Sequence, residues 1–310
     1  MTNGKVTQHA NSVFEQPWWL DIVAPGKWEE ISIQKDGRME ARWPIVYNGD
    51  KALMPRETQN IGIWFRDEPN ESISSRLSRE KSDIGQLLEK ADKKFWDCRI
   101  STDNSYVLPF IWAGFHVAPM FTYVLDNLSD TEKVRQGYSK TVKKNLKRAS
   151  KIVEIVEDPD TSVLLDCMRA TYRAQNRKMP ISESLIESIV EESLRYNSGK
   201  MIGAVDTSGA YHACSFFVYD QNRCYYLLSG SVPELRTSGA QTLILDNAIT
   251  FASSRSKIFD FEGSMVEGIE KFFRQFGGRP SEYYRISRLS VADVLKESVK
   301  PKVKRILGYK

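Results

Sequence analysis

The chain has 310 residues, of which 41% are hydrophobic and 27% charged, and its formal net charge is only +4. This composition is typical of a folded globular protein and excludes a disordered one. The sequence contains no apolar run of about 20 residues, the length that spans a bilayer. The polar segment from Met1 to Asn11 also lacks the apolar core of a secretion signal. We therefore expect a cytoplasmic protein without a membrane span.

Cysteine and histidine usage narrows the possible chemistry. Four cysteines lack any CxxC spacing, which favours reduced, buried thiols over disulfides or a zinc site: Cys98, Cys167, Cys214 and Cys224. Only three histidines occur, and none lies one helical turn from another ligand-type residue. We therefore expect a metal-independent reaction that uses carboxylates, hydroxyls, lysines or backbone amides.

The first half of the sequence predicts a mixture of helices and strands. Residues 14–23 favour a short helix, and two strands, 28–35 and 38–47, flank the turn dipeptide Asp36-Gly37. Apolar spacing predicts a long amphipathic helix from about residue 73 to Trp96. A strand is expected at 121–125.

The second half has a clearer pattern. Ser129 and Glu132 form a capping box that opens a basic helix, expected to run over 131–151. A strand (152–156), two helices (163–175 and 183–196) and three strands (201–205, 210–219 and 224–229) follow. The remaining elements are a helix at 239–254, a strand at 257–262, a helix at 266–276 and a strand at 281–286. This order is typical of GNAT acyltransferases. We therefore predict an α/β (α+β) fold of two tandem GNAT-like domains, at 1–130 and 131–310, each a mixed twisted sheet flanked by helices.

One candidate donor site is the loop Arg236-Thr237-Ser238-Gly239-Ala240-Gln241. GNAT enzymes carry a Q/R-x-x-G-x-G/A signature here, because small residues let backbone N–H groups approach the pyrophosphate of acyl-coenzyme A at a helix N-terminus. Gln241 departs from the signature, which expects a small residue. An ordinary helix start is the alternative interpretation.

A second candidate site follows the strand at 257–262. Strand alternation places Phe259 and Phe261 on one face and Asp260 and Glu262 on the other. We predict Glu262 as the catalytic acid/base and Ser264 as an orienting hydroxyl. Asp260 is expected to satisfy neighbouring backbone or arginine groups instead.

The segment 259–278 and the residues Tyr283-Tyr284-Arg285 resemble the C-terminal signature of the FemABX, or BioF2-like, acyltransferases. The segments 14–21, 121–126 and 139–151 share this resemblance. It implies transfer of an acyl or aminoacyl group to a peptidoglycan precursor without a metal, and in characterised members the donor is aminoacyl-tRNA. Phe273 stands where those members carry a lysine.

Two further groups of residues predict binding surfaces. The basic segment, with Lys133, Arg135, Lys140, Lys143, Lys144, Lys147, Arg148 and Lys151, fits a tRNA backbone, an anionic membrane surface touched peripherally or a diphosphate-linked sugar, unless it is simply a solvated face. A second basic cluster ends the chain, from Lys296 to Lys310. All seven tryptophans lie in the first 112 residues. Trp19, Trp64 and Trp112, with Arg42 as an anion clamp, are candidates for an acceptor cleft, although tryptophan is more often core.

Together these patterns predict an acyltransferase. It would move an acyl or aminoacyl group onto an amine or hydroxyl of a nucleotide-linked or lipid-linked cell-envelope glycan or peptidoglycan precursor. The donor would be acetyl- or acyl-coenzyme A or aminoacyl-tRNA, with no tightly bound cofactor. Two alternatives stay open: a tRNA-dependent ligase of peptidoglycan crossbridges, and a GNAT fold that only binds a glycan.

Overall fold

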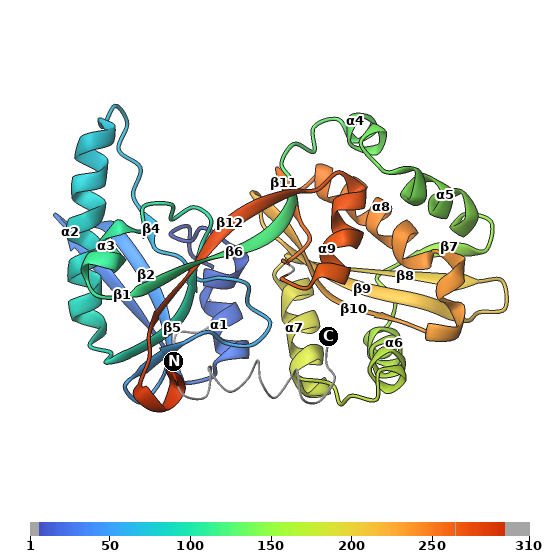
Figure 1. Ribbon diagram of the computed structural model, residues 1–310, viewed down its shortest axis with the longest axis horizontal. Helices are drawn as coiled ribbons and strands as arrows, with labels where there is room; N and C mark the ends of the chain where they lie inside the picture. Colours follow the sequence, from blue (N-terminus) through green and yellow to red (C-terminus); the bar gives the residue numbers. More distant parts are fainter. Residues whose placement is uncertain (1–5, 264, 295–310) are drawn as a thin grey trace. The chain divides into compact units, whose positions relative to one another are not determined.

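The computed structural model describes residues 6–263 and 265–294 (Figure 1). Contacts divide the chain into two units. Of the described residues, unit 1 contains 6–7, 12–23, 121–263 and 265–282. Unit 2 contains the described residues 8–11, 24–120 and 283–294. The chain enters unit 1 at Phe121, shortly before the expected domain boundary at 130.

Unit 2 begins with the hairpin expected from the sequence. Strands β1 (Trp28–Lys35) and β2 (Arg38–Asn48) pair in antiparallel fashion. Asp36 and Gly37 both have positive φ, 51° and 75°, as a two-residue turn between twisted strands requires. The remaining strands are β3 (Lys51–Leu53), β4 (Trp64–Phe65), β5 (Phe95–Ile100) and part of β12 (Arg279–Arg288). The sheet order in this unit is β1-β2-β3-β5-β12, and β4 pairs with β2.

Two helices accompany this sheet. Helix α2 (Ile73–Ala91) starts at Ser72, whose hydroxyl accepts a hydrogen bond from Ser75 N, and buries an apolar face that includes Ile84 and Leu87. The expected extension to Trp96 is wrong, because Asp92 adopts a left-handed conformation that ends the helix, and Trp96 lies in β5. Helix α3 (Leu108–Trp112) is a short element before β6 (His116–Leu125).

Between residues 153 and 273, unit 1 has the element order predicted from the second half of the sequence. Its strands are β7 (Val153–Glu157), β8 (Gly199–Asp206), β9 (Tyr211–Tyr219), β10 (Arg223–Ser231) and β11 (Ile258–Asp260), with the later residues of β6. Its helices are α1 (Pro17–Val23), α4 (Thr131–Gln136), α5 (Lys140–Ala149), α6 (Thr161–Ala174), α7 (Glu183–Arg195), α8 (Ala240–Ser253) and α9 (Glu267–Phe273). Single turns of 3-10 helix occur at η1 (Val13–Glu15), η2 (Pro233–Ser238) and η3 (Arg274–Phe276). The sheet order is β6-β11-β10-β9-β8-β7.

Helices cover both faces of this sheet (Figure 1). Helices α8 and α5 pack on one face, while α6 and α7 pack on the other. The core between the sheet and α8 includes Phe217, Phe259, Ile244 and Ala248, all with an exposed fraction of 0%. Helix α1 packs against α7, where Trp18 stacks on Tyr196 with ring centroids 4.8 Å apart. The N-terminal helix is therefore part of the core of unit 1.

The basic segment forms two helices and not the single helix expected over 131–151. Helix α4 ends at Gln136, and Ser139 starts α5 by accepting a hydrogen bond from Val142 N. Between them, Ser139 N donates to the carbonyl of Gln275, which fixes the break. Among the described residues, no helix combines the length and the apolar character that crossing a membrane requires.

Candidate active site

Strands β10 and β11 separate at the centre of the unit 1 sheet. Their parallel pairing runs from Arg223↔Ile258 to Tyr225↔Asp260, while β10 continues to Ser231. A β-bulge in β10 interrupts its register with β9 between Tyr226 and Leu228. Bulges bend the strand that carries them, so we expect β10 to bend just beyond the last residue that pairs with β11.

The bulge also changes which side chains share a face. Tyr226 and Ser229 would lie on opposite faces of a regular strand, but they pair with Phe217 and Ser215 of β9, which lie on the same face. Sequence alternation alone does not predict this cluster. The inserted Leu227 is the only local signal, and it cannot be recognised as a bulge without the partner strand.

Gln241 joins this polar cluster. Its Nε2 donates to Ser215 Oγ at 2.8 Å and to the Tyr226 hydroxyl at 2.9 Å. Burial raises the pKa of the Tyr226 phenol, although hydrogen bonds with Ser229, Ser215 and Gln241 act in the opposite direction. Tyr226 is therefore a neutral phenol at physiological pH, and its oxygen accepts the hydrogen bond from Gln241. The departure of Gln241 from the GNAT signature has a structural explanation, since its side chain reaches toward the sheet.

The predicted donor loop lies at the start of α8. Residues 236–238 belong to η2, and Gly239 follows with a φ of 83°. A Cβ atom at Gly239 would lie 3.1 Å from the carbonyl oxygen of Asn145 in α5, so the close approach of α5 also favours glycine here. Ser238 Oγ accepts from Ala240 N at 3.2 Å, and Arg236 Nε donates to Ser231 Oγ at 3.1 Å. Arg236 and Thr237 are exposed, whereas Ser238, Gly239 and Ala240 are buried.

A buried hydrogen-bond network lies at the end of β11. Asp260, with an exposed fraction of 0%, accepts from Arg223 Nη1 at 2.7 Å and from Glu262 N at 2.7 Å. Thr122 Oγ1 donates to Asp260 Oδ1 and accepts from Gly263 N at 2.7 Å. The expectation that Asp260 satisfies backbone and arginine groups is confirmed.

This network holds Glu262 in an unusual conformation. Its φ is 58°, in the left-handed region that costs a non-glycine residue about 1–2 kcal/mol. Glu262 is half-buried and directly follows the residues where β10 and β11 separate. Backbone strain of this kind recurs at functional sites, so the observation supports the catalytic candidate. Ser264, the other candidate, lies outside the described residues.

The sequence resemblance expects a lysine at the position of Phe273. Phe273 is 5% exposed and stacks on Phe261 with ring centroids 5.0 Å apart. The rings of Phe273 and Tyr226 also meet in a T-shaped contact, with centroids 6.1 Å apart. The flanking Lys271 and Arg274 are exposed, so neither replaces a lysine at this position.

The four expected acceptor residues do not form one cluster. Trp19 is fully buried against Phe14, which makes it a core residue of unit 1. Arg42 is 1% exposed and donates to Glu30 at 2.7 Å and to the carbonyl of His9 at 3.1 Å. Both partners belong to unit 2, so these contacts stabilise that unit. Trp64 is half-buried and its ring contacts His9. Trp112 is 58% exposed, with Lys81 Nζ 5.1 Å above its ring.

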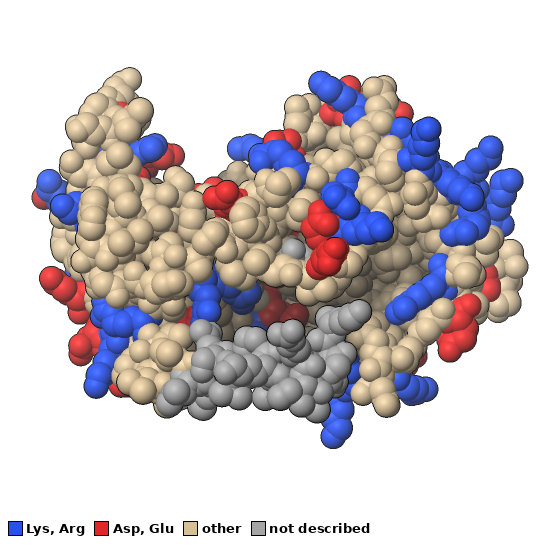
Figure 2. All heavy atoms as spheres, in the orientation of Figure 1, with Lys and Arg blue, Asp and Glu red and all other residues tan. Residues whose placement is uncertain are grey.

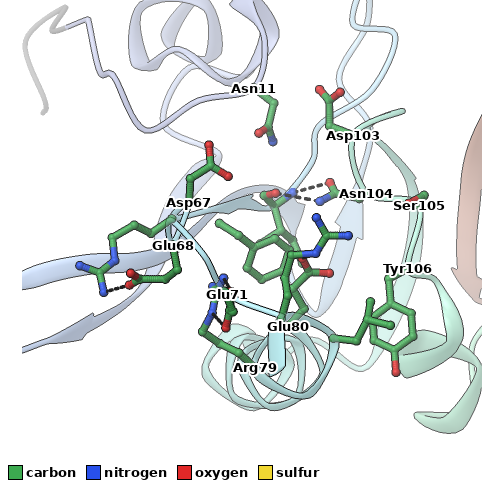
Figure 3. A pocket seen from close by; sticks show the side chains of 15 residues that line it. Asn11, Asp67, Glu68, Glu71, Arg79, Glu80, Asp103, Asn104, Ser105 and Tyr106 are labelled. Carbon is green, nitrogen blue, oxygen red and sulfur yellow. Dashed lines mark hydrogen bonds and ion pairs between the residues drawn. The ribbon is translucent and has the colours of Figure 1, made fainter. Parts of the chain in front are cut away.

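Unit 2 instead contains a polar cavity of about 410 Å³ (Figure 3). Arg79 pairs in bidentate fashion with Glu71, and Arg66 pairs with Glu68. Asp103 and Glu80 also line the cavity. None of the four expected acceptor residues is part of its lining. The sequence offers little signal for this cavity, because its charges come from α2, from the loop before it and from the loop after β5.

Lysine and arginine side chains gather over α4 and α5 (Figure 2). Arg135 is used internally, since it donates to Asp246 of α8 at 3.0 and 3.1 Å. Lys140, Lys144 and Lys147 are exposed on the face of α5 opposite the buried Val142 and Ala149. This face is a candidate contact for an anionic partner. The second basic cluster, 296–310, lies outside the described residues.

The cysteines agree with the sequence prediction. All four are free and buried. Burial raises the pKa of each thiol, to about 12 for Cys98 and about 11 for Cys167. Among the residues that the structure describes, no group of three or more His, Cys, Asp or Glu side chains is placed to hold a metal ion.

Comparison with known protein families identifies the domain that contains this candidate site. Residues 132–274 match the family described as an acetyltransferase (GNAT) domain. This segment contains the bulged β10, the loop before α8 and the end of β11. Residues 132–274 are therefore a GNAT-type acyltransferase domain.

Solved structures extend the likeness over most of the chain. The chain is similar to FemX, with a TM-score of 0.66 and 12% identity over 89% of this chain and 93% of FemX. It is similar to the C-terminal domain of a lysylphosphatidylglycerol synthetase from Agrobacterium fabrum, with a TM-score of 0.58 and 11% identity over 90% of this chain and 94% of that domain. The chain is also similar to a tandem GNAT protein from the clavulanic acid biosynthesis pathway. The TM-score is 0.51 and the identity 12%, over 91% of this chain and 96% of that protein. No protein of curated function matches the sequence. The predicted α/β fold of tandem GNAT-like domains, with a FemX-like architecture, is confirmed.

Proposed function

We propose that this GNAT protein transfers an acyl or aminoacyl group onto an amine or hydroxyl of a cell-envelope glycan or peptidoglycan precursor. The FemABX resemblance in the sequence and the likeness of the fold to FemX support the acceptor class. The name of the lysylphosphatidylglycerol synthetase neighbour indicates that related folds also serve lipid acceptors. We place the reaction on the cytoplasmic side of the membrane, where such precursors are assembled.

The observation that carries the proposal is the position of Glu262. Its strained backbone is fixed by Asp260 at the point where β10 and β11 separate. A carboxylate there can take the proton of the attacking amine or hydroxyl, while the acyl carbonyl lies between the strands. Backbone N–H groups of β10 beyond Tyr225 and the Tyr226 hydroxyl are the candidate donors to the oxyanion. Ser264 remains the proposed orienting hydroxyl.

Acyl-coenzyme A is the first candidate donor. Its pyrophosphate would lie against the loop from Arg236 to Gln241, of which Arg236 and Thr237 are exposed, beside the partial positive charge of the N-terminus of α8. Phe273, in the position of the family lysine, weakens the case for aminoacyl-tRNA.

The test measures transfer from acetyl-coenzyme A and from aminoacyl-tRNA to a peptidoglycan precursor. Glu262→Gln should lower kcat by about two orders of magnitude with unchanged stability. Glu262→Gly separates chemistry from backbone strain, since glycine accepts a positive φ at no cost and should also be inactive. Activity of either variant close to that of the wild type would refute the role of Glu262.

A further inference from the structure

Helix α3 of unit 2 is apolar on both of its sides. Its five residues are Leu-Pro-Phe-Ile-Trp, none of which is charged. Pro109 and Phe110 are buried, whereas Leu108, Ile111 and Trp112 are 45%, 47% and 58% exposed. These three residues are spaced i, i+3 and i+4, so they share one side of the helix, which we call the α3 apolar face. A helix at the surface of a globular domain normally carries polar residues on its outer side.

Buried aromatic residues hold the α3 apolar face toward solvent. The rings of Phe110 and Trp43 meet with centroids 5.9 Å apart, and those of Phe115 and Trp96 meet at 5.6 Å. Gly114 ends the helix with a φ of 83°, and Phe115 N donates to the carbonyl of Phe110 at 3.0 Å. This hydrogen bond belongs to the Schellman motif, which reverses the chain after a helix. The inner side of α3 is therefore fixed on the core, and the outer side is left without a partner from the described part of unit 2.

Two cations border the α3 apolar face. Lys81 Nζ of α2 lies 5.1 Å above the ring of Trp112, and Arg288 Nη2 of β12 donates to the carbonyl of Ala113 at 2.6 Å. Both side chains are exposed, and neither forms an ion pair within the described part of the chain. Figure 2 shows few charged side chains over α3 itself. The surface thus combines exposed apolar side chains with uncompensated positive charge at their edge.

The size of the α3 apolar face is too small for a stable protein partner. Each protein in such a complex buries about 800 Å². Even at about 250 Å² for each side chain, three half-exposed residues supply less than half of that area. A bilayer requires no such minimum, because every apolar side chain that enters it adds to binding, and cations beside it are attracted to anionic headgroups. Tryptophan is moreover enriched at the boundary between lipid and water.

We propose that the α3 apolar face docks on an anionic lipid bilayer. Leu108, Ile111 and Trp112 enter the boundary between headgroups and acyl chains, and Lys81 and Arg288 lie at the lipid phosphates. The contact is peripheral and reversible, since only three apolar side chains enter the lipid. Docking itself does not rest on the proposed function. Its use, which is to bring the chain to a lipid-linked acceptor, does rest on it.

The experiment measures co-sedimentation of the full chain with two kinds of vesicle. One kind is phosphatidylcholine alone, and the other contains phosphatidylcholine and phosphatidylglycerol in equal parts. The wild type should bind the mixed vesicles more tightly. Ile111→Ser/Trp112→Ser should lower its partition coefficient about tenfold or more. Lys81→Gln should lower it about fivefold on mixed vesicles and leave binding to neutral ones unchanged.

Leu194→Ser is the matched control for loss of an exposed apolar side chain. Leu194 lies in α7 of unit 1 and is 42% exposed, comparable with Leu108 and Ile111. Its partition coefficient should stay within about twofold of the wild-type value. Because the substituted side chains are exposed, thermal unfolding of all these variants should match that of the wild type.

Fluorescence identifies the residue that enters the lipid. All seven tryptophans lie in the described part of the chain, and six of them are buried or half-buried, whereas Trp112 is exposed. Brominated phosphatidylcholine in the mixed vesicles should therefore quench part of the wild-type emission. Trp112→Phe keeps an aromatic side chain, so it should still sediment with the vesicles and lose this quenching.

Three results would overturn the docking surface. They are equal sedimentation of the wild type with and without mixed vesicles, unchanged partitioning of Ile111→Ser/Trp112→Ser, and a dimer in analytical ultracentrifugation that this variant dissociates, which would assign the face to a second copy. The proposed function fails separately, because vesicle binding without acyl transfer would refute it while the docking surface stands. Equal transfer by the wild type and Ile111→Ser/Trp112→Ser to a lipid-linked acceptor in vesicles would refute only the use of docking for that acceptor.

Discussion

Asp260 and Arg223 form a buried ion pair immediately before β10 and β11 separate. Arg223 Nη1 lies 2.7 Å from Asp260 Oδ2, and the two side chains are 11% and 0% exposed. The carboxylate also accepts from Thr122 and from the backbone of Glu262. The pair therefore connects the stability of the sheet with the conformation of the candidate catalytic residue.

Asp260→Asn should destabilise unit 1 by about 3–5 kcal/mol, because it leaves the Arg223 guanidinium buried without a counter-charge. Urea unfolding followed by circular dichroism measures this loss. Arg223→Met/Asp260→Asn removes both charges and should recover part of the stability. A single substitution that costs less than about 1 kcal/mol would show that the pair is solvated.

Thr122→Val should release the loop at Glu262 while it keeps the volume of the side chain. Thr122 Oγ1 accepts from Gly263 N at 2.7 Å, and loss of this acceptor costs about 1–3 kcal/mol. We expect a lower kcat with little change in the KM of the donor. Thr122→Ser restores the hydroxyl and should recover most of the activity; an inactive serine variant would contradict this account.

Tyr226→Phe tests the hydroxyl at the bulge. If this group stabilises the transition state, kcat should fall about a hundredfold in steady-state transfer assays. Tyr219→Phe in β9 is the control, because it removes a hydroxyl that bonds to Asn197 at 3.2 Å, away from the cluster. Similar losses of activity in both variants would assign the effect to packing.

Gly230→Ala should destabilise unit 1 by several kcal/mol. A Cβ atom at Gly230 would lie 2.2 Å from Met168 N and 2.3 Å from Cys167 C, which are backbone atoms of α6 that cannot rotate away. In contrast, Gly268→Ala in α9 meets no atom within 4 Å and should add up to about 1 kcal/mol. Thermal unfolding of the two variants should therefore shift in opposite directions.

Alkaline titration tests the buried thiol of Cys98. Its pKa is raised from 9.0 to about 12 by burial, so between these values the folded state holds a proton that the unfolded state loses. The free energy of unfolding should therefore fall with rising pH above about 9, by about 1.4 kcal/mol per pH unit from this thiol. Because lysines and tyrosines also titrate, the measurement compares urea unfolding of the wild type and Cys98→Ala between pH 8 and about 10.5. Parallel curves would contradict the prediction.

The sequence predicts most of the fold because turns and periodicity are local. Asp36-Gly37 places the first hairpin correctly, and the element order of unit 1 follows from apolar spacing. The errors have tertiary causes. The basic segment divides because Ser139 N bonds to Gln275, and α2 stops at a left-handed Asp92. Neither interaction can be recognised from residue type alone.

The candidate site is less predictable than the fold. The signature loop and the residue Glu262 can be found from motif spacing, but the cluster of Tyr226, Ser229 and Gln241 depends on a bulge that only strand pairing defines. The burial of Trp19 and Arg42 likewise depends on distant segments. Tryptophan and arginine provide no signal that distinguishes a binding role from a core role.

The inserted residue in β10 has a consequence for how this protein can be varied. Deletion of Leu227 would leave Leu228 opposite Phe216 and Ser229 opposite Ser215, so regular pairing would return and the later residues would keep their faces. The bend of β10 would be lost, while Ser229 would stay on the face of Tyr226 and Gly230 would still admit α6. A variant without Leu227 therefore separates the effect of the bend from the effect of the side chains.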